Sequence, residues 1–396
     1  MDVLELTREL VAIDSQNPGV GEHQIAHWVA DWCLQRDFDV RVLEYEKGRP
    51  NVLVTVKKGE GSHLGLSGHL DTKPVGDAIS SWNTNPFELT IDGDTAYGLG
   101  ATDMKGAVAA MMIALERFAD SSLSGSVSLV LTADEEQGSD AGAQALSRSN
   151  DLPDVDALLI GEPSGVSKPW ESLFLVSRGI CCFHVRVDTL QGHSGLSQTL
   201  GRNAVLVAAD LVHAFENFAP PVARPGRVPS TPTVNPGMMM NGGVCFGVWP
   251  GRATVSIEIR TVPGMDREDV VQAIADLVQR TVSGQATATI QYEEGSMGWM
   301  PAVELDPDHR IVTAANRAAG TVLGHPLPLD AFPGGTDAAY FMGEKGIPTV
   351  VSLGPGWISV AHGANEKVGV SQLHDAVDIY TELIRNYLEV DTDAFP

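Results

Sequence analysis

The sequence is poor in positive charge. Its 396 residues include 26 lysines and arginines against 51 aspartates and glutamates, which gives a formal net charge of −25 at pH 7. A surface with this excess of negative charge repels nucleic acid and anionic membranes. We therefore expect neither as a partner, and an anionic substrate would need a local group of arginines.

Cysteine and long hydrophobic runs are also scarce. The four cysteines (Cys33, Cys181, Cys182 and Cys245) form no CxxC pair and no cluster with histidine, so we expect reduced side chains packed in the interior. The longest apolar run, 107–115, is far short of the roughly 20 residues that span a bilayer. The acidic N-terminus has no signal-peptide pattern, and we expect a cytoplasmic protein.

The length predicts two domains, because a single core rarely serves so many residues. Over 1–176 and 297–396, strand and helix patterns alternate, which predicts an α/β domain with a mostly parallel sheet. Over 177–296 the order is strand, helix, two strands, helix, strand, which is typical of a ferredoxin-like α+β unit. The second unit therefore interrupts the first. Within it, we expect Val244–Trp249 and Ala253–Arg260 to pair as a hairpin.

The expected elements of the first domain follow from hydrophobic periodicity. The expected helices are 3–13, 22–35, 103–118, 141–148, 307–319 and 371–388, and the expected strands are 39–45, 51–56, 64–67, 126–132, 157–160 and 348–353. Asp103 is expected to cap the third of these helices, since aspartate is favoured at that position.

Four short polar motifs each follow a predicted strand or a glycine turn. They are Gly68–Thr72, Gly100–Gly106, Thr132–Glu136 and Gly161–Pro163. Because ligands gather beyond the carboxyl ends of the strands in such a sheet, we expect these loops to meet in one cleft. A fifth candidate, His362, lies near the C-terminus.

The candidate ligands in these loops are imidazoles and carboxylates without thiolate, a set that suits zinc in a catalytic site. Two ions need a bridging carboxylate, and in one arrangement Asp103 is the bridge. His69 and Glu162 then complete the first ion. Glu136 and His362 complete the second.

Two further acids have predicted roles beside these ligands. Asp71, two residues after His69, is expected to hold the second ring nitrogen of that histidine. Glu135 is the expected general base, which takes a proton from a metal-bridging water and passes it to the leaving amine. A lone Asp-Glu-Glu run is more often a solvated turn, and a histidine beside glycine is more often structural. The ordered set of four motifs favours a dinuclear metallohydrolase.

Together, these motifs resemble those of the co-catalytic zinc metallopeptidase family, which includes glutamate carboxypeptidase, acetylornithine deacetylase, succinyl-diaminopimelate desuccinylase and the aminoacylases. The match runs from about residue 4 to residue 388. The resemblance implies two Zn²⁺ per subunit, replaceable by Co²⁺ or Mn²⁺, on the five ligands named above, with Asp71 and Glu135 as helper acid and general base. It also implies that the inserted unit is a lid and dimerisation domain of a homodimer.

The family's substrate-side residues fall on further positions of this sequence. Its Gly-His-Ser histidine, which in dimeric members reaches the partner's active site and polarises the scissile carbonyl, falls on His193; a surface-loop histidine is the alternative. The arginine and asparagine that bind the substrate's carboxylate fall on Arg260 and Asn235. A further arginine and the substrate-backbone loop fall on Arg178 and on Gly334, Gly335 and Thr336.

Two stretches of the inserted unit stand apart from the family pattern. Phe246–Pro250 replaces an Asn-x-x-Pro turn, and Met238–Met240 either line an adaptable apolar pocket or pack in the core of the lid.

The resemblance implies a zinc-dependent hydrolase of small-molecule substrates. The Gly-Gly-Thr-Asp-Ala-Ala-Tyr run favours cleavage of the amide bond of an N-acyl amino acid, or release of a C-terminal amino acid from a peptide. One alternative is a biosynthetic deacylase of the acetylornithine or succinyl-diaminopimelate type. Another is a catalytically silent relative that binds a metabolite.

Overall fold

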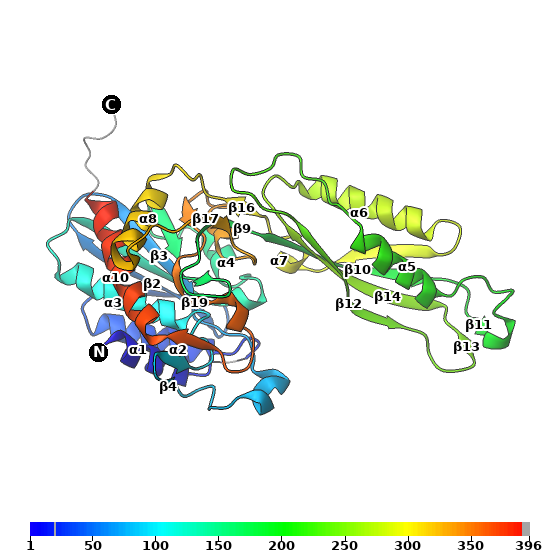
Figure 1. Cartoon of the computed structure of the whole chain (residues 1–396), viewed down its shortest axis with the longest axis horizontal. Helices are drawn as coiled ribbons and strands as arrows, with labels where there is room; N and C mark the ends of the chain where they lie inside the picture. Colours follow the sequence, from blue (N-terminus) through cyan, green and yellow to red (C-terminus); the bar gives the residue numbers. More distant parts are fainter. Residues whose placement is uncertain (20, 390–396) are drawn as a thin grey trace. The chain divides into compact units, whose positions relative to one another are not determined.

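The computed structural model describes residues 1–19 and 21–389, which form two compact units (Figure 1). Unit 1 comprises Met1–Ser177, Leu305–Phe332 and the chain from Thr336 onward. Unit 2 comprises Arg178–Glu304 and Pro333–Gly335. Among the described residues, no helix has the length and hydrophobicity needed to cross a lipid bilayer.

The main elements of unit 1 alternate between helix and strand along the chain. Its helices are α1 (Val3–Ala12), α2 (Glu22–Leu34), α3 (Lys105–Asp120), α4 (Ala143–Arg148), α8 (Arg310–Leu323), α9 (Ala338–Phe341) and α10 (Val370–Leu388). Its principal strands are β1 (Asp39–Glu46), β2 (Arg49–Lys58), β3 (His63–His69), β6 (Gly125–Thr132), β7 (Ala157–Ile160) and β18 (Thr349–Val350). Short strands complete it: β4 (Thr90–Asp92), β5 (Thr95–Tyr97), β8 (Pro163–Gly165), β9 (Leu173–Ser177), β17 (Leu329–Ala331), β19 (Gly354–Trp357) and β20 (Lys367–Gly369).

The principal sheet of unit 1 has the order β1-β2-β6-β3-β7-β18. Strands β6, β3, β7 and β18 run parallel, and β1 and β2 form an antiparallel edge. Every residue of β6 and β7 is buried, as expected for parallel strands with both faces covered. Helix α3 packs against β3 and β6 and against α1 and α10. The predicted α/β class and mostly parallel sheet are confirmed.

The turn before α3 differs from its prediction, because Asp103 does not cap the helix. The N-cap residue is Met104, its side chain makes no capping bond, and the Asp103–Met104 peptide is cis. The Glu366 carboxylate accepts the backbone N–H groups of Gly100, Thr102 and Asp103 instead, at 2.9, 2.9 and 3.0 Å. This distant acid satisfies the turn, so the Asp103 carboxylate is available for other partners.

Unit 2 contains a four-stranded antiparallel sheet with helices on one face (Figure 1). The sheet order is β12-β14-β10-β15, which matches the predicted ferredoxin-like arrangement. Its elements are β10 (Gly179–Asp188), β11 (Gly192–His193), α5 (Ala204–Glu216), β12 (Thr233–Gly242), β13 (Val248–Trp249), β14 (Arg252–Thr261), α6 (Arg267–Val282), β15 (Thr287–Tyr292), α7 (Gly295–Gly298) and β16 (Val303–Glu304). Phe183, Phe215, Ile257 and Ile274 belong to the core between sheet and helices.

The predicted hairpin between Val244–Trp249 and Ala253–Arg260 is wrong. Strand β14 lies between β10 and β12, and β12 begins at Thr233, eleven residues before the predicted strand. The pairing shifts register between Pro236 and Met239, and this irregularity hides the alternation that marks a strand. The segment taken for the strand forms the short β13, which pairs with β11.

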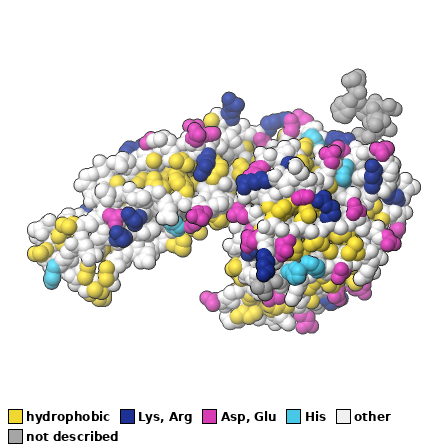
Figure 2. Space-filling model, turned by 180° about the vertical axis from the view of Figure 1, so that it is seen from behind, with side chains coloured by type: hydrophobic (Ala, Val, Ile, Leu, Met, Phe, Trp, Pro, Cys, Tyr) yellow, Lys and Arg dark blue, Asp and Glu magenta, His cyan; other side chains and the backbone are white. Residues whose placement is uncertain are grey.

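The three consecutive methionines of β12 are exposed, so packing in the core of unit 2 is excluded. The relative exposures of Met238, Met239 and Met240 are 58%, 63% and 46%. Met239 and Met240 line a surface hollow of about 990 Å³, together with polar side chains such as His184 and Arg252. Hydrophobic side chains reach the surface elsewhere on this unit too (Figure 2).

The cysteines differ in accessibility, and the prediction that all are packed fails for Cys245, which is exposed. Burial raises the pKa of both Cys33 and Cys181 to about 12, and burial, with help from Glu258, raises that of Cys182 to about 11. We expect a thiol reagent such as Ellman's reagent at pH 8 to modify one thiol per native chain rapidly and four after unfolding. Cys245→Ser should remove the rapid phase, and a rapid phase that survives this change would contradict the assignment.

Candidate active site

The polar motifs lie at the carboxyl ends of neighbouring parallel strands. His69 is the last residue of β3, and Thr132, the last residue of β6, precedes the turn that carries Glu135 and Glu136. Glu162 follows β7 by two residues. Because β6, β3 and β7 are adjacent, these side chains emerge at one edge of the sheet, where ligands gather in this class of fold.

Asp103 lies between two histidines and offers a different oxygen to each. Its Oδ1 is 2.9 Å from His69 Nε2, and its Oδ2 is 3.1 Å from His362 Nε2. His362 Nε2 is also 3.1 Å from Glu136 Oε2, and His69 Nε2 is 3.5 Å from Glu162 Oε1. The structure thus brings all five candidate ligands together in two sets that share Asp103.

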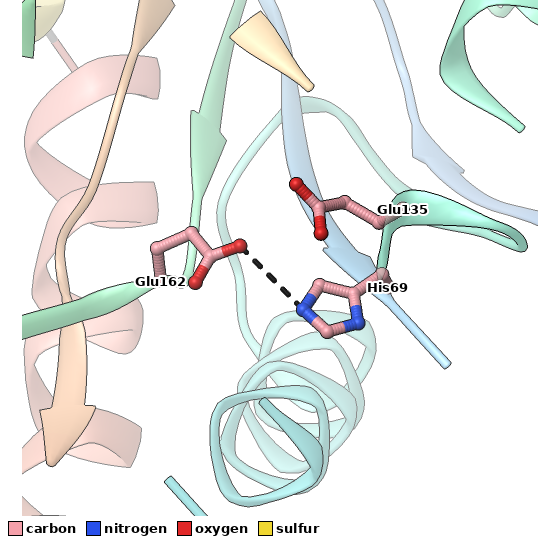
Figure 3. A group of neighbouring side chains, drawn as sticks. All are labelled: His69, Glu135 and Glu162. Atoms are coloured by element: carbon pink, nitrogen blue, oxygen red, sulfur yellow. Dashed lines mark ion pairs between the residues drawn. The ribbon is translucent and has the colours of Figure 1, made fainter. Parts of the chain in front are cut away.

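Glu135 lies beside the first of these sets. Figure 3 shows the carboxylates of Glu135 and Glu162 approaching the His69 imidazole from different sides. Ligand atoms of these three residues lie within 4.8 Å of one another, and so do those of His69, Asp103 and Glu136.

The chemistry of this donor set fits two divalent cations. Asp103, Glu136 and Glu162 are buried, and buried carboxylates without counter-charge are costly. Burial raises the pKa of Glu162 well above its usual range, and the nearby Asp103 adds to the shift. Burial raises the pKa of Glu135 in the same way, helped by Asp337. Metal ions would remove this penalty, and nitrogen and oxygen ligands without sulfur suit zinc and similar ions.

The histidines respond to the same carboxylates. Burial lowers the pKa of His362, but its contacts with Asp103 and Glu136 outweigh burial and raise that pKa to about 10. Burial also opposes the charged form of His69, yet Asp103 and Asp71 raise its pKa well above the usual value. Both rings are therefore held in a strongly negative environment, which is the environment that a cation requires.

Asp71 supports this site differently from its prediction. The closest partner of His69 Nδ1 is the backbone oxygen of Asp71, at 2.9 Å, and the carboxylate oxygen is 3.5 Å away. The Asp71 carboxylate mainly accepts the backbone N–H groups of Glu135 and Glu136, at 3.2 and 3.1 Å. It also accepts from Asn17 Nδ2 at 2.9 Å. Asp71 therefore holds residues 134–136, which we call the acid turn, as well as the histidine.

A buried network that the sequence did not predict supports the acid turn. Asp134 has a left-handed backbone (φ 63°) and accepts hydrogen bonds from Arg49 and from Asn17, the latter at 3.0 Å. Glu22 accepts the Asp134 backbone N–H at 2.9 Å and pairs with Arg49 at 3.1 Å. Burial raises the pKa of Glu22 to about 7, with Asp71 adding to the shift.

Glu366 was also missed as a positioning residue, although a signal for it was present. It lies four residues after the candidate ligand His362, at the end of the run His362-Gly-Ala-Asn-Glu366. Its three backbone hydrogen bonds hold the turn that presents Asp103. His362 itself has a left-handed backbone (φ 59°), a conformation that is uncommon for non-glycine residues and is found often at functional sites.

The substrate-side candidates of unit 2 lie on its sheet and its loops. His193, in β11, is exposed, and its Nδ1 accepts the Gly195 N–H at 3.0 Å. Arg260 and Asn235 are half-buried, and both donate to the same carboxylate, that of Glu258.

The remaining candidates are held by backbone contacts. Arg178 Nη2 donates to the Thr231 oxygen at 2.9 Å, and the Arg178 N–H donates to the Gly334 oxygen at 3.0 Å. Gly335 follows in unit 2. Thr336, in unit 1, is buried and donates its N–H to Ser177 Oγ at 2.9 Å.

Comparison with known proteins agrees with this geometry. The model of peptidase family M20/M25/M40 matches residues 65–386, and the chain belongs to this family. It is 26% identical to a "probable succinyl-diaminopimelate desuccinylase" of Staphylococcus epidermidis, covering 98% of each chain. It is 28% identical to an acetylornithine deacetylase of Aliivibrio salmonicida, covering 92% of this chain and 91% of the relative.

A solved structure supports the fold. An M20 family metallo-carboxypeptidase from Sulfolobus solfataricus aligns with a TM-score of 0.80 at 20% identity, over 98% of this chain and 99% of that one. The expected metallopeptidase and aminoacylase family is therefore confirmed, and the protein is a hydrolase of amide or peptide bonds.

Proposed function

We propose that the protein is a zinc-dependent hydrolase that frees an amino acid, by cleaving the amide bond of an N-acyl amino acid or of a C-terminal residue. The observation that carries this proposal is the Asp103 carboxylate, which offers one oxygen to each of two histidine–carboxylate sets. That arrangement is what two neighbouring ions with a shared ligand require. The acid turn next to it supplies Glu135.

In this proposal, His69, Asp103, Glu136, Glu162 and His362 hold the ions. When bound, the two ions polarise the scissile carbonyl as Lewis acids and lower the pKa of water. Glu135 takes the proton of the attacking water and delivers it to the amine that leaves. Asp71 keeps Glu135 and Glu136 in place through their backbone N–H groups.

We assign substrate recognition to the residues that the family resemblance implies. Arg260 and Asn235 bind the substrate's carboxylate, and Arg178 adds positive charge beside them. The Gly334, Gly335 and Thr336 backbone lies along the substrate. His193, supplied by a second copy of the chain, donates to the developing oxyanion.

A homodimer through unit 2 is part of the same proposal. Strand β12 is an edge strand of its sheet within the described residues, and it carries the exposed Met238, Met239 and Met240. An exposed, apolar edge strand favours pairing with another chain, and a second copy would cover it.

The runner-up is a biosynthetic deacylase. Two of the relatives are a probable succinyl-diaminopimelate desuccinylase and an acetylornithine deacetylase, and both names describe removal of an acyl group. Identities of 26% and 28% support the reaction type more than the side chain of the substrate.

The proposal is tested with the full chain, stripped by a chelator and reloaded with Zn²⁺. We expect no hydrolysis by the metal-free protein and recovery of activity at about two equivalents of zinc per chain. The panel contains N-acetyl and N-benzoyl amino acids, dipeptides, N-acetylornithine and N-succinyl-diaminopimelate, followed by release of the free amine. A zinc-loaded protein that hydrolyses none of them would contradict the proposal, and preference for the last two would favour the runner-up.

A further inference from the structure

An internal carboxylate occupies the two donors assigned above to the substrate. Glu258 Oε1 accepts from Arg260 Nε at 3.0 Å and from Asn235 Nδ2 at 3.0 Å, and Glu258 Oε2 accepts from Arg260 Nη2 at 3.3 Å. The Glu258 side chain is 15% exposed and that of Arg260 is 31% exposed. The pair is therefore partly shielded from water, where charge interactions are stronger than at an open surface.

The register of the sheet dictates this grouping. Glu258 and Arg260 are two residues apart on β14, so they share a face, while Ile257 and Ile259 point into the core. Asn235 lies directly opposite Glu258 on β12. All three polar side chains thus stand on the face of the sheet opposite to the helices.

Arg260, the main partner of Glu258, lies near a second arginine, Arg178. Burial lowers the pKa of Arg178, and the nearby Arg260 lowers it further through like-charge repulsion. The Arg260 guanidinium thus contacts the Glu258 carboxylate and also lies near a second guanidinium, that of Arg178. A carboxylate brought by a ligand would meet positive charge at Arg260, but it competes with Glu258 for the same hydrogen-bond donors.

We propose that Glu258 is a resident carboxylate that occupies Arg260 and Asn235 until the carboxylate of the substrate displaces it. This inference rests on the proposed function, because it assigns the same two donors to the substrate. Two carboxylates cannot both ionise at contact distance without repulsion, so the substrate must move Glu258 aside. Glu258 thereby weakens the binding of substrates that carry a free carboxylate and raises KM for them.

The test is Glu258→Gln, which keeps the shape and one acceptor oxygen but removes the charge. We expect KM for an N-acyl amino acid with a free carboxylate to fall about tenfold, with kcat changed less than about twofold. The same N-acyl amino acid capped as its carboxamide should show an unchanged KM, because it brings no charge to the site.

The matched control is Glu293→Gln. Glu293 is another acid of unit 2, and it contacts His184 rather than Arg260. Its replacement removes the same charge from the same unit and should leave both KM values unchanged. Glu258→Ala should shift KM in the same direction as Glu258→Gln, which guards against an effect peculiar to glutamine.

The outcomes separate this inference from the proposed function. A wild-type enzyme that hydrolyses the panel, with an unchanged or raised KM in Glu258→Gln, overturns the inference and leaves the function standing. Calorimetric titration of the zinc-loaded proteins with N-acetyl amino acids reports binding without turnover. If the wild type hydrolyses nothing, tighter binding by Glu258→Gln still supports the inference, and equal or absent binding overturns it.

Discussion

Replacing Glu135 by Gln is expected to lower kcat about 10³-fold while the protein keeps its full metal content. A general base contributes typically 10²–10⁴-fold, and glutamine keeps the size of the side chain but cannot accept a proton. The backbone N–H of Glu135 bonds to Asp71, and substitution of the side chain does not disturb that bond. The measurements are kcat on the best substrate of the panel and zinc per chain by elemental analysis.

Two results would argue against this role for Glu135. Near-normal turnover would show that another group moves the proton. Loss of one equivalent of zinc would show that Glu135 is a ligand, a possibility that its position beside His69 and Glu162 makes worth measuring. Glu116→Gln serves as the control. Glu116 lies on α3 and pairs with Arg36, so its replacement should change neither quantity.

The second large effect is expected for His193→Ala, with a loss of about 10²–10³-fold in kcat, the usual cost of removing one oxyanion donor. Within the described part of the chain, the His193 side chain accepts one hydrogen bond, from the Gly195 N–H, so stability should hardly change. His213→Ala is the control, because His213 is an exposed histidine of the same unit that pairs with Glu216.

Mixing the two inactive variants tests whether His193 acts across a dimer. A hybrid of His193→Ala with Glu135→Gln has one site with an intact Glu135 and a His193 from the other chain. Random mixing should then restore about a quarter of the wild-type rate per chain, because about half of the dimers are hybrids with one working site each. A mixture no more active than its parents would contradict action in trans.

The sequence predicted the α/β class, the ferredoxin-like unit and the loops of the site for a physical reason. Buried parallel strands such as β6 and β7 are short apolar runs, and polar residues such as His69 and Glu162 stand where these runs end. The ends of adjacent parallel strands must lie together, so local patterns implied a common cleft.

The parts that were missed depend on partners far away in the chain. Asn17 and Asp134 bond across 117 residues, and Glu366 and Asp103 across 263, so no local pattern points to either pair. The prediction that Asp103 caps α3 was wrong. It rested on the local preference of aspartate for helix N-termini, whereas the conformation of this turn is set by the distant Glu366. Strand β12 was missed because its register shift near Pro236 interrupts the alternation.

The buried ion pairs of Arg49 limit which residues can be varied when this enzyme is redesigned. Arg49 is a cation that pairs with the buried Glu22 and with Asp134, the first residue of the acid turn, and its side chain is only 18% exposed. Removing one member of a buried charge network leaves its partners uncompensated, at a cost of about 3–5 kcal/mol. Variant libraries of this enzyme should therefore keep Glu22, Arg49 and Asp134 unchanged together, since replacing any one of them would lower stability without changing a residue assigned to the substrate.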